Sequence, residues 1–281
     1  MIIAIPNKGR LSQPTVDLLA QAGIRIENSG RRLVASTNNP DINVLLARAK
    51  DIPRYVAMSA ADAGITGYDM VVESGVDVEV LLKLGFGRAS LVVAAPSDSG
   101  IKSVEDLEGK RVATEFSRIA ENYFKEKGVN VEIVEVSGAC ENAPHIGVAD
   151  AILDLTSTGT TLRMNRLEVI DRVLETEAVL IANKERKDSF GVRALVTAIQ
   201  SVINARGMMY LMMNVPADAL EKVKQIVPGL KGPTVMKVES DDTMLAVHVV
   251  VPENKLFEVV EELKRIGARD ILIMPVQRLI Y

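Results

Sequence analysis

Short apolar runs alternate with helix-like segments along the first part of the chain. Residues 2–6 form an apolar run that predicts a strand, and residues 13–22 follow with the spacing of an amphipathic helix. Further strands are expected at residues 32–36, 44–47, 63–66 and 78–84, and helices at 53–59 and 68–74. Strands that alternate with helices in this way predict an α/β fold.

A second unit is expected after Gly85-Phe86-Gly87, which interrupts the pattern. Residues 89–95 are almost wholly apolar, as in a strand that is buried on both faces. The pattern then predicts helices at 118–127 and 142–147, and strands at 111–114, 131–136, 149–155 and 179–182. The last of these strands is expected to return the chain to the first unit.

The C-terminal part changes character. After a helix over 194–205, the pattern predicts elements in the order β-α-β-β-α-β, at residues 208–215, 217–226, 234–239, 244–250, 252–266 and 271–274. This order matches a ferredoxin-like unit, which commonly serves as a packing or ligand-sensing module.

Composition excludes several classes of function. The 281 residues carry 33 Lys and Arg against 37 Asp and Glu, and only 4% are aromatic, which argues against a nucleic-acid binder. No apolar stretch reaches the roughly 20 residues of a membrane span. The one cysteine, Cys140, cannot form an internal disulfide, so we expect a soluble protein of the cytoplasm.

The most informative stretch runs from Ala149 to Leu162. The period of a strand places Asp150 and Asp154 on one face, and a loop rich in hydroxyl groups follows around Gly159. Glycine can turn successive N–H groups toward an anion, so the loop is a candidate phosphate site. The adjacent carboxylates would suit ribose hydroxyls or Mg²⁺. The alternative is a turn that only caps a helix.

A second candidate site follows the first strand, at Lys8-Gly9-Arg10. Here two cations flank a glycine that lets the backbone approach a ligand, and Arg32, Arg48 and Lys50 are candidates to join them. The alternative is that each is a solvated surface charge.

The sequence resembles the long, histidine-regulated form of ATP phosphoribosyltransferase, the first enzyme of histidine biosynthesis. The resemblance covers the whole chain and is most specific over residues 141–162. Shared motifs also lie at residues 5–11, 51–53, 62–69, 84–87 and 112–116. Two positions depart from the family: Ser59 stands where Gly is usual, and Ser117 where Pro is usual.

The resemblance implies a bilobal catalytic half like a type II periplasmic binding protein, followed by a regulatory domain. One catalytic lobe would comprise residues 1–88 and 178–204, the other 89–177, and the regulatory domain 205–281. ATP and phosphoribosyl pyrophosphate (PRPP) would react, with Mg²⁺, to phosphoribosyl-ATP and pyrophosphate. L-Histidine would be the feedback inhibitor, and the assembly a dimer that can form a hexamer.

The resemblance also implies roles for particular residues. Arg48, Asp154 and Glu141 would be catalytic, with the general base either Asp154 or Glu141 and the Mg²⁺ ligands unassigned. The residues expected to bind PRPP are Asp150, Asp154, Ser157, Thr158, Gly159, Thr160 and Thr161. Those expected to bind ATP or pyrophosphate are Lys8, Gly9, Arg10, Arg32, Lys50 and Phe116. Those expected to bind histidine are Asn214, Leu230, Thr234 and Asp270.

Two other functions fit parts of the sequence. The turn at residues 106–112 is also common in bilobal proteins that only bind a small ligand. A catalytically inactive regulatory subunit would bind histidine without turnover.

Overall fold

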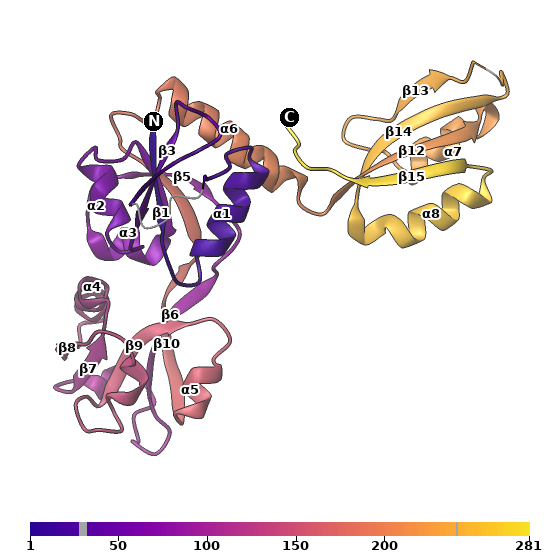
Figure 1. Ribbon diagram of the computed structural model, residues 1–281. Coiled ribbons are helices and arrows are strands. Elements are labelled where there is room, and N and C mark those ends of the chain that lie inside the picture. The colour runs from indigo at the N-terminus through magenta and orange to yellow at the C-terminus, as the bar shows by residue number, and fades with distance from the viewer. Residues whose placement is uncertain (28–32, 240) are drawn as a thin grey trace. The chain divides into compact units, whose positions relative to one another are not determined.

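The computed structural model describes residues 1–27, 33–239 and 241–281. The chain divides into two compact units, residues 1–196 and residues 197–281. The first unit holds two β-sheets and the second holds one (Figure 1). Within the described ranges, no helix is long and apolar enough to cross a membrane.

The first sheet carries six strands in the order β2-β3-β1-β4-β11-β5. β1 is parallel to β3 and β4, whereas β11 is antiparallel to β4 and β5. The strands are β1 (Ile2–Pro6), β2 (Val34–Ser36), β3 (Asn43–Ala47), β4 (Ala63–Gly67), β5 (Glu79–Lys83) and β11 (Ala178–Ala182). The helices of this part are α1 (Ser12–Gln21), α2 (Ile52–Ala57) and α3 (Tyr68–Ser74). The expected return of the chain into this sheet is therefore confirmed by β11.

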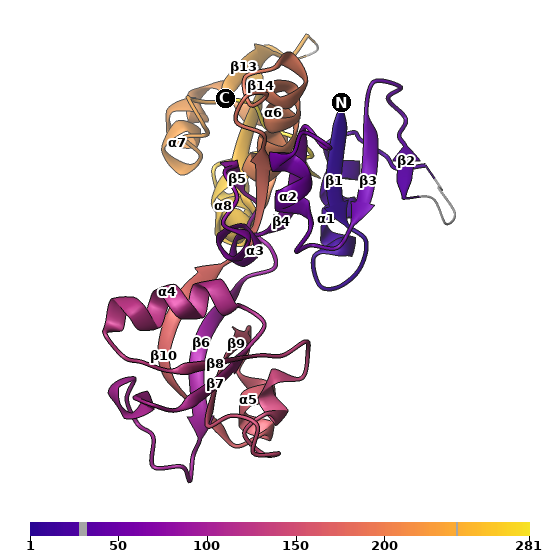
Figure 2. The same ribbon diagram turned by 90° about the vertical axis from the view of Figure 1, so that its left-hand side faces the viewer.

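The second sheet carries five strands in the order β10-β6-β9-β7-β8. β7 is parallel to β8 and β9, and β6 is antiparallel to β9 and β10. The strands are β6 (Ala89–Pro96), β7 (Arg111–Thr114), β8 (Glu132–Glu135), β9 (Ala151–Thr156) and β10 (Leu167–Thr176). Its helices are α4 (Ser117–Lys127) and α5 (Thr160–Met164), with single 3₁₀ turns at Glu105–Leu107 and Cys140–Asn142. Figure 2 shows α4 along one face of this sheet.

Two parts of the second sheet differ from expectation. The helix predicted at 142–147 is wrong, because only the turn Cys140–Asn142 forms; Pro144 and the left-handed Gly147 (φ 73°) interrupt any continuation. The ten-residue strand β10 was not predicted. Its pairing with β6 contains two register shifts, between Val169 and Asp171 and between Arg172 and Leu174, so its sequence does not alternate regularly.

The second unit is an antiparallel sheet in the order β13-β14-β12-β15. Its elements are α6 (Phe190–Ala205), which begins in the first unit, β12 (Met208–Pro216), α7 (Leu220–Ile226), β13 (Thr234–Lys237), β14 (Met244–Pro252), α8 (Leu256–Arg265) and β15 (Arg269–Pro275). Short 3₁₀ turns at Ala217–Ala219 and Glu253–Lys255 precede the last two helices. The predicted order β-α-β-β-α-β is confirmed.

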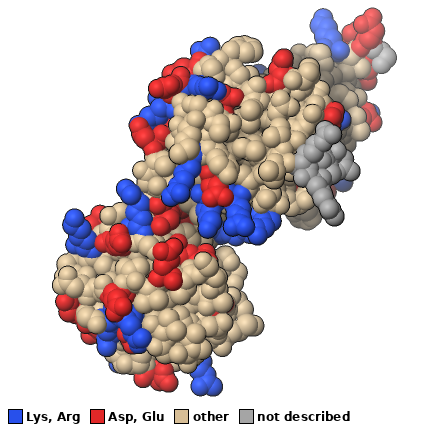
Figure 3. Space-filling model, turned by 60° about the vertical axis from the view of Figure 1, so that its left-hand side comes forward, with Lys and Arg blue, Asp and Glu red and all other residues tan. Residues whose placement is uncertain are grey.

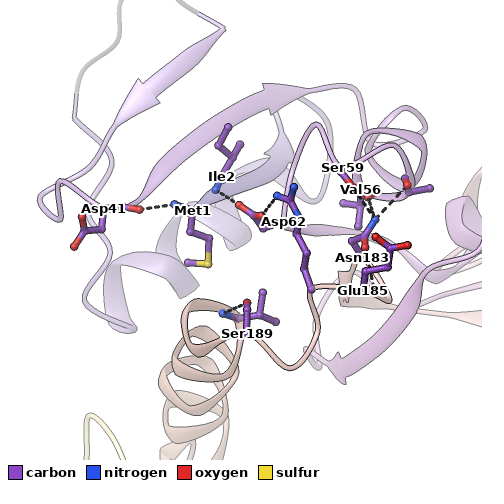
Figure 4. Close-up of polar contacts among 12 residues, drawn as sticks. Met1, Ile2, Asp41, Val56, Ser59, Asp62, Asn183, Glu185 and Ser189 are labelled. Atoms are coloured by element: carbon purple, nitrogen blue, oxygen red, sulfur yellow. Dashed lines mark hydrogen bonds and ion pairs between the residues drawn. The ribbon is translucent and has the colours of Figure 1, made fainter.

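Polar side chains form hydrogen bonds at the end of the first sheet where β1 and β4 begin (Figure 4). Asp62 accepts the Ile2 N–H at 2.7 Å and pairs with Arg186. Burial raises the pKa of the Asp62 carboxyl, but these two interactions outweigh it and lower the pKa overall. Asn183 donates to the Val56 carbonyl at the end of α2 and to the Ser59 hydroxyl. Ser59 has a positive φ of 60°, which explains why Gly is usual there.

Candidate functional site

A hollow of about 240 Å³ lies at the carboxyl end of β9. Seven of its ten lining residues carry a carboxylate or a hydroxyl group. It is lined by Glu141, Asp154, Leu155, Thr156, Ser157, Thr158, Gly159, Thr160, Thr161 and Leu162. The structure therefore brings together most of the residues that the sequence assigned to PRPP.

The loop after β9 is shaped by Gly159, whose φ of 71° lies in the left-handed region. The Gly159 N–H donates to the Thr156 hydroxyl at 3.0 Å, and the Thr158 and Thr160 hydroxyls lie 2.9 Å apart. Arg163 donates to the Thr158 carbonyl at 3.3 Å. The N–H groups of the first helical turn have no carbonyl partner within α5, so they are available to an anion. Because α5 has only five residues, its dipole adds little.

Asp154 is the most perturbed carboxylate of the hollow. Its pKa is raised to about 6: burial is the largest cause, the charges of Glu141 and Glu115 add to it, and the Leu155 N–H, bonded at 2.7 Å, opposes them. In β9 the first three residues are buried and the last three are partly exposed, so Asp154 stands where the strand leaves the core. A carboxylate with a pKa near 6 can accept a proton at neutral pH.

The residue before Glu141 is the buried Cys140, whose thiol donates to the Ala113 carbonyl at 3.1 Å. Burial is the largest cause that raises the pKa of this thiol, with the nearby acids adding to it. The side chain is therefore a neutral packing group next to the hollow, without the thiolate that a nucleophile requires.

Asp150 lies away from the hollow, just before β9 begins. Its carboxylate accepts the Arg111 backbone N–H at 2.9 Å and forms an ion pair with the Arg111 side chain at 3.3 Å. These bonds to Arg111 lower the pKa of Asp150. The strand period does place Asp150 and Asp154 on one face, but four residues of strand, about 13 Å, separate them.

The basic residues predicted from the sequence follow two neighbouring strands of the first sheet. β1 and β3 run parallel, with Pro6 opposite Ala47 and the Asn7 N–H bonded to the Ala47 carbonyl at 2.8 Å. The exposed residues after these strands therefore share one edge: Lys8, Gly9, Arg10, Arg48 and Lys50. Figure 3 shows Lys and Arg side chains gathered along the lower border of the upper part of the molecule. Arg32 lies outside the described residues.

Phe116 is buried rather than presented to a ligand. Its side chain is 2% exposed and packs with Ile119, Ala120 and Tyr123 in the core of the second sheet. The Phe116 N–H donates to the Thr114 hydroxyl at 2.9 Å. In this arrangement the ring has no free face for adenine.

The residues expected to bind histidine form two groups on the sheet of the second unit. The Asn214 amide donates to the Asp270 carboxylate at 3.0 Å, between β12 and β15. Thr234 stands on the edge strand β13, opposite His248 of β14, and Leu230 precedes it. Two strand spacings, roughly 10 Å, separate β13 from β12.

The sequence analysis missed two residues beside the hollow, Glu115 and Arg163. Glu115 contributes to the raised pKa of Asp154, and Arg163 holds the loop. Arg163 carried a signal, since it lies one turn after Gly159, whereas nothing in the pattern around Glu115 indicated its position. In the described part of the chain, no cluster of three Asp, Glu, His or Cys residues could bind a metal by itself.

The fold and the site define a class of protein: an α/β protein with a polar loop at the end of a strand, followed by a separate unit with an antiparallel sheet. The sequence profile of ATP phosphoribosyltransferases matches residues 48–203, and that of the HisG C-terminal domain matches residues 205–278. The chain belongs to the ATP phosphoribosyltransferase family, the transferases of histidine biosynthesis, in the long form with a C-terminal domain.

Full-length relatives carry the same name. An ATP phosphoribosyltransferase of Methanocella arvoryzae is 56% identical and one of Methanosarcina barkeri is 51% identical, each over 99% of this chain and 99% and 98% of the relative. Among solved structures, the ATP phosphoribosyl transferase (HisG:HisZ) complex from Thermotoga maritima gives a TM-score of 0.66 at 27% identity, covering 73% of this chain and 99% of that one. A substrate-binding protein of an amino acid ABC transporter gives 0.50 at 15% identity, covering 73% of this chain and 94% of that one, which confirms the bilobal fold.

Proposed function

We propose that this chain transfers the phosphoribosyl group of PRPP to N1 of the adenine of ATP, releasing pyrophosphate. The observation that carries the proposal is the hollow at the end of β9, where the hydroxyl groups around Gly159 adjoin the carboxylates of Asp154 and Glu141. The loop would hold the 5′-phosphate through its N–H and hydroxyl donors. Asp154 would face the ribose hydroxyls.

The reaction needs charge stabilisation more than a protein nucleophile. As the bond between ribose C1 and the pyrophosphate oxygen breaks, negative charge develops on the leaving group and positive charge on the ribose. Lys8, Arg10, Arg48 and Lys50, gathered at one edge of the first sheet, are the cations that we assign to pyrophosphate and ATP. Adenine N1 supplies the electron pair for the new bond to C1.

One proton must leave the adenine amino group after this attack. The raised pKa of Asp154, about 6, leaves the group mostly ionised near pH 7.5 yet basic enough to accept that proton. Glu141 lines the same hollow and is the second candidate base. Ser-His-Asp chemistry is not required.

Mg²⁺ would be held mainly by the substrate. This ion commonly takes one or two carboxylates together with phosphate oxygens, and Asp154 and Glu141 are the carboxylates that line the hollow. The pair fits such a partial ligand set, and the bound ion would neutralise charge on the departing pyrophosphate.

The activity is tested by following the ultraviolet absorbance of phosphoribosyl-ATP with ATP, PRPP and Mg²⁺. We expect product only when all three are present. A protein that binds L-histidine without forming product would instead be a regulatory subunit, and one that binds neither PRPP nor ATP would be a ligand-binding protein of another kind. Either result would contradict the proposal.

We also propose that the second unit binds L-histidine and inhibits the enzyme, and that the protein works in the cytoplasm as a dimer that can form a hexamer. The Asp270 carboxylate, bonded to Asn214, would pair with a charged nitrogen of histidine. Feedback requires that histidine bind one state of the assembly better than another.

Asp270→Asn tests the histidine site. Asp270 has a φ of 54°, which Asn tolerates better than other residues, so the variant removes charge with little backbone strain. The loss of a charged hydrogen bond weakens binding about ten- to a hundredfold. We expect calorimetry to show this loss while turnover without histidine stays within about twofold. Histidine binding equal to that of the unmodified protein would contradict the assignment.

A further inference from the structure

Three hydrogen bonds join the loop between β8 and Glu141 to residues 113–115 at the end of β7. The Val136 N–H donates to the Thr114 carbonyl at 3.0 Å, and the Cys140 thiol donates to the Ala113 carbonyl at 3.1 Å. Between these two bonds, the Gly138 N–H donates to the Glu115 carboxylate. The 3₁₀ turn Cys140–Asn142 follows at once and carries Glu141.

This loop contains two consecutive residues with left-handed backbone angles. Gly138 has a φ of 76°, and Ala139 follows with a φ of 50°. A left-handed alanine is strained because its Cβ crowds the backbone, so surrounding contacts must hold it. The bond from Gly138 to Glu115 is the contact immediately before that strained residue.

Glu115 comes from the end of β7, the strand between β8 and β9. Glu115 is an exposed residue, yet its carboxylate accepts a hydrogen bond from the Gly138 backbone N–H. This bond joins the end of β7 to the loop that leads to Glu141.

We propose that Glu115 is a positioning residue for the transfer reaction: by accepting the Gly138 N–H, its carboxylate holds the loop that sets Glu141 at the hollow, opposite Asp154. The inference rests on the proposed function of the hollow. It goes beyond it because Glu115 does not line the hollow and acts through Glu141.

The matched variants are Glu115→Ala, which removes the acceptor, and Glu115→Gln, which keeps an oxygen for the same N–H but removes the charge. We expect Glu115→Ala to lower kcat at least tenfold with the KM for ATP unchanged. Glu115→Gln is expected to stay within about threefold of the unmodified enzyme, because the bond survives. Hydrogen exchange at the Gly138 amide should rise only in the alanine variant.

Glu108→Ala is the control, since Glu108 is another exposed acid near the second sheet and accepts the Asn130 N–H at 2.7 Å. It does not line the hollow, so its loss should leave kcat unchanged. Combining Glu115→Ala with Glu141→Gln should be no worse than Glu141→Gln alone, because residues that act as a unit are not additive.

Different results separate the two proposals. An unmodified protein without turnover would defeat the proposed function before Glu115 is tested. Turnover that is lost in Glu141→Gln but normal in Glu115→Ala would overturn only the positioning role. Equal losses in Glu115→Ala and Glu115→Gln would also overturn it, because they would assign the effect to charge rather than to the bond.

Discussion

The sheets of the two units expose polar side chains in different ways. All five residues of β4 and of β11 are buried, so in the first unit the polar groups of the candidate site lie at strand ends and in the loops that follow. In β12 of the second unit, Leu211, Met213 and Val215 are buried, while the residues between them are partly exposed. The first unit thus places its polar groups at sheet edges, whereas the second has partly exposed residues along a sheet face.

If turnover depends on the first unit and histidine binding on the second, a change in the loop after β9 should abolish turnover and leave histidine binding intact. Gly159→Val should have the largest effect. A β-branched residue is strained at φ 71°, and its Cβ would lie 3.3 Å from the Arg163 guanidinium, which must shift by a few tenths of an ångström. We expect loss of PRPP binding and at least a thousandfold loss of kcat/KM, measured by calorimetry and by the absorbance of the product.

Gly128→Val is the matched control for the backbone cost. Gly128 ends α4 with a φ of 70°, and nothing lies within 4 Å of the position of an added Cβ. This variant should lose stability to a similar degree and keep its turnover. Normal PRPP binding by Gly159→Val would show that the loop is not part of the PRPP site. Loss of histidine binding in that variant would show that the two units do not bind their ligands independently.

Asp154→Asn should lower activity at least a hundredfold and raise stability. The folded-state pKa is raised from 3.8 to about 6, so the ionised carboxylate destabilises the folded state above that value. Because the folded protein binds more protons between these two values, stability increases as the pH falls. Asparagine removes the charge and keeps an oxygen for the Leu155 N–H.

The expected gain in the free energy of unfolding is about 3 kcal/mol at pH 7.5, falling to about 1 kcal/mol at pH 4.5. Urea unfolding at the two pH values measures it. A gain that is equal at both pH values would show that the effect comes from packing and not from the charge. A loss of stability at pH 7.5 would contradict the desolvated state of Asp154.

The sequence predicted most strands because apolar runs in both units are clear, and it predicted the loop of the hollow because Gly159 stands among hydroxyl residues. It failed where a regular period is broken. β10 has two register shifts, and Pro144 and Gly147 end a segment with helical spacing. Such features depend on pairing partners and on backbone angles that the local pattern does not contain.

Side-chain direction was the other limit. The strand period placed Asp150 and Asp154 on one face, but four residues of strand put them about 13 Å apart, so sharing a face did not bring them to one site. The resemblance gave Phe116 a place beside adenine, whereas the ring packs into the core. Glu115 lies in a motif shared with the family, at residues 112–116, but the motif did not indicate its role, because its bond to Gly138 joins the end of β7 to the loop after β8, 23 residues away.

Asp150→Ala should have the smallest effect, and it sharpens the comparison within one strand. Asp150 precedes β9 whereas Asp154 is its fourth residue, and of the two only Asp154 lines the hollow. The side chains of Asp150 and Arg111 are 37% and 39% exposed, so we expect about 1 kcal/mol of lost stability from the broken hydrogen bonds and no more than a twofold change in the KM for PRPP. Because the pKa of Asp150 is lowered, the loss of stability should be present at neutral pH. It should disappear as the pH falls below the ordinary pKa of a carboxyl, 3.8, and through the lowered pKa of Asp150. A tenfold rise in the KM for PRPP would instead return Asp150 to the substrate site and require that the bond to Arg111 open when PRPP binds.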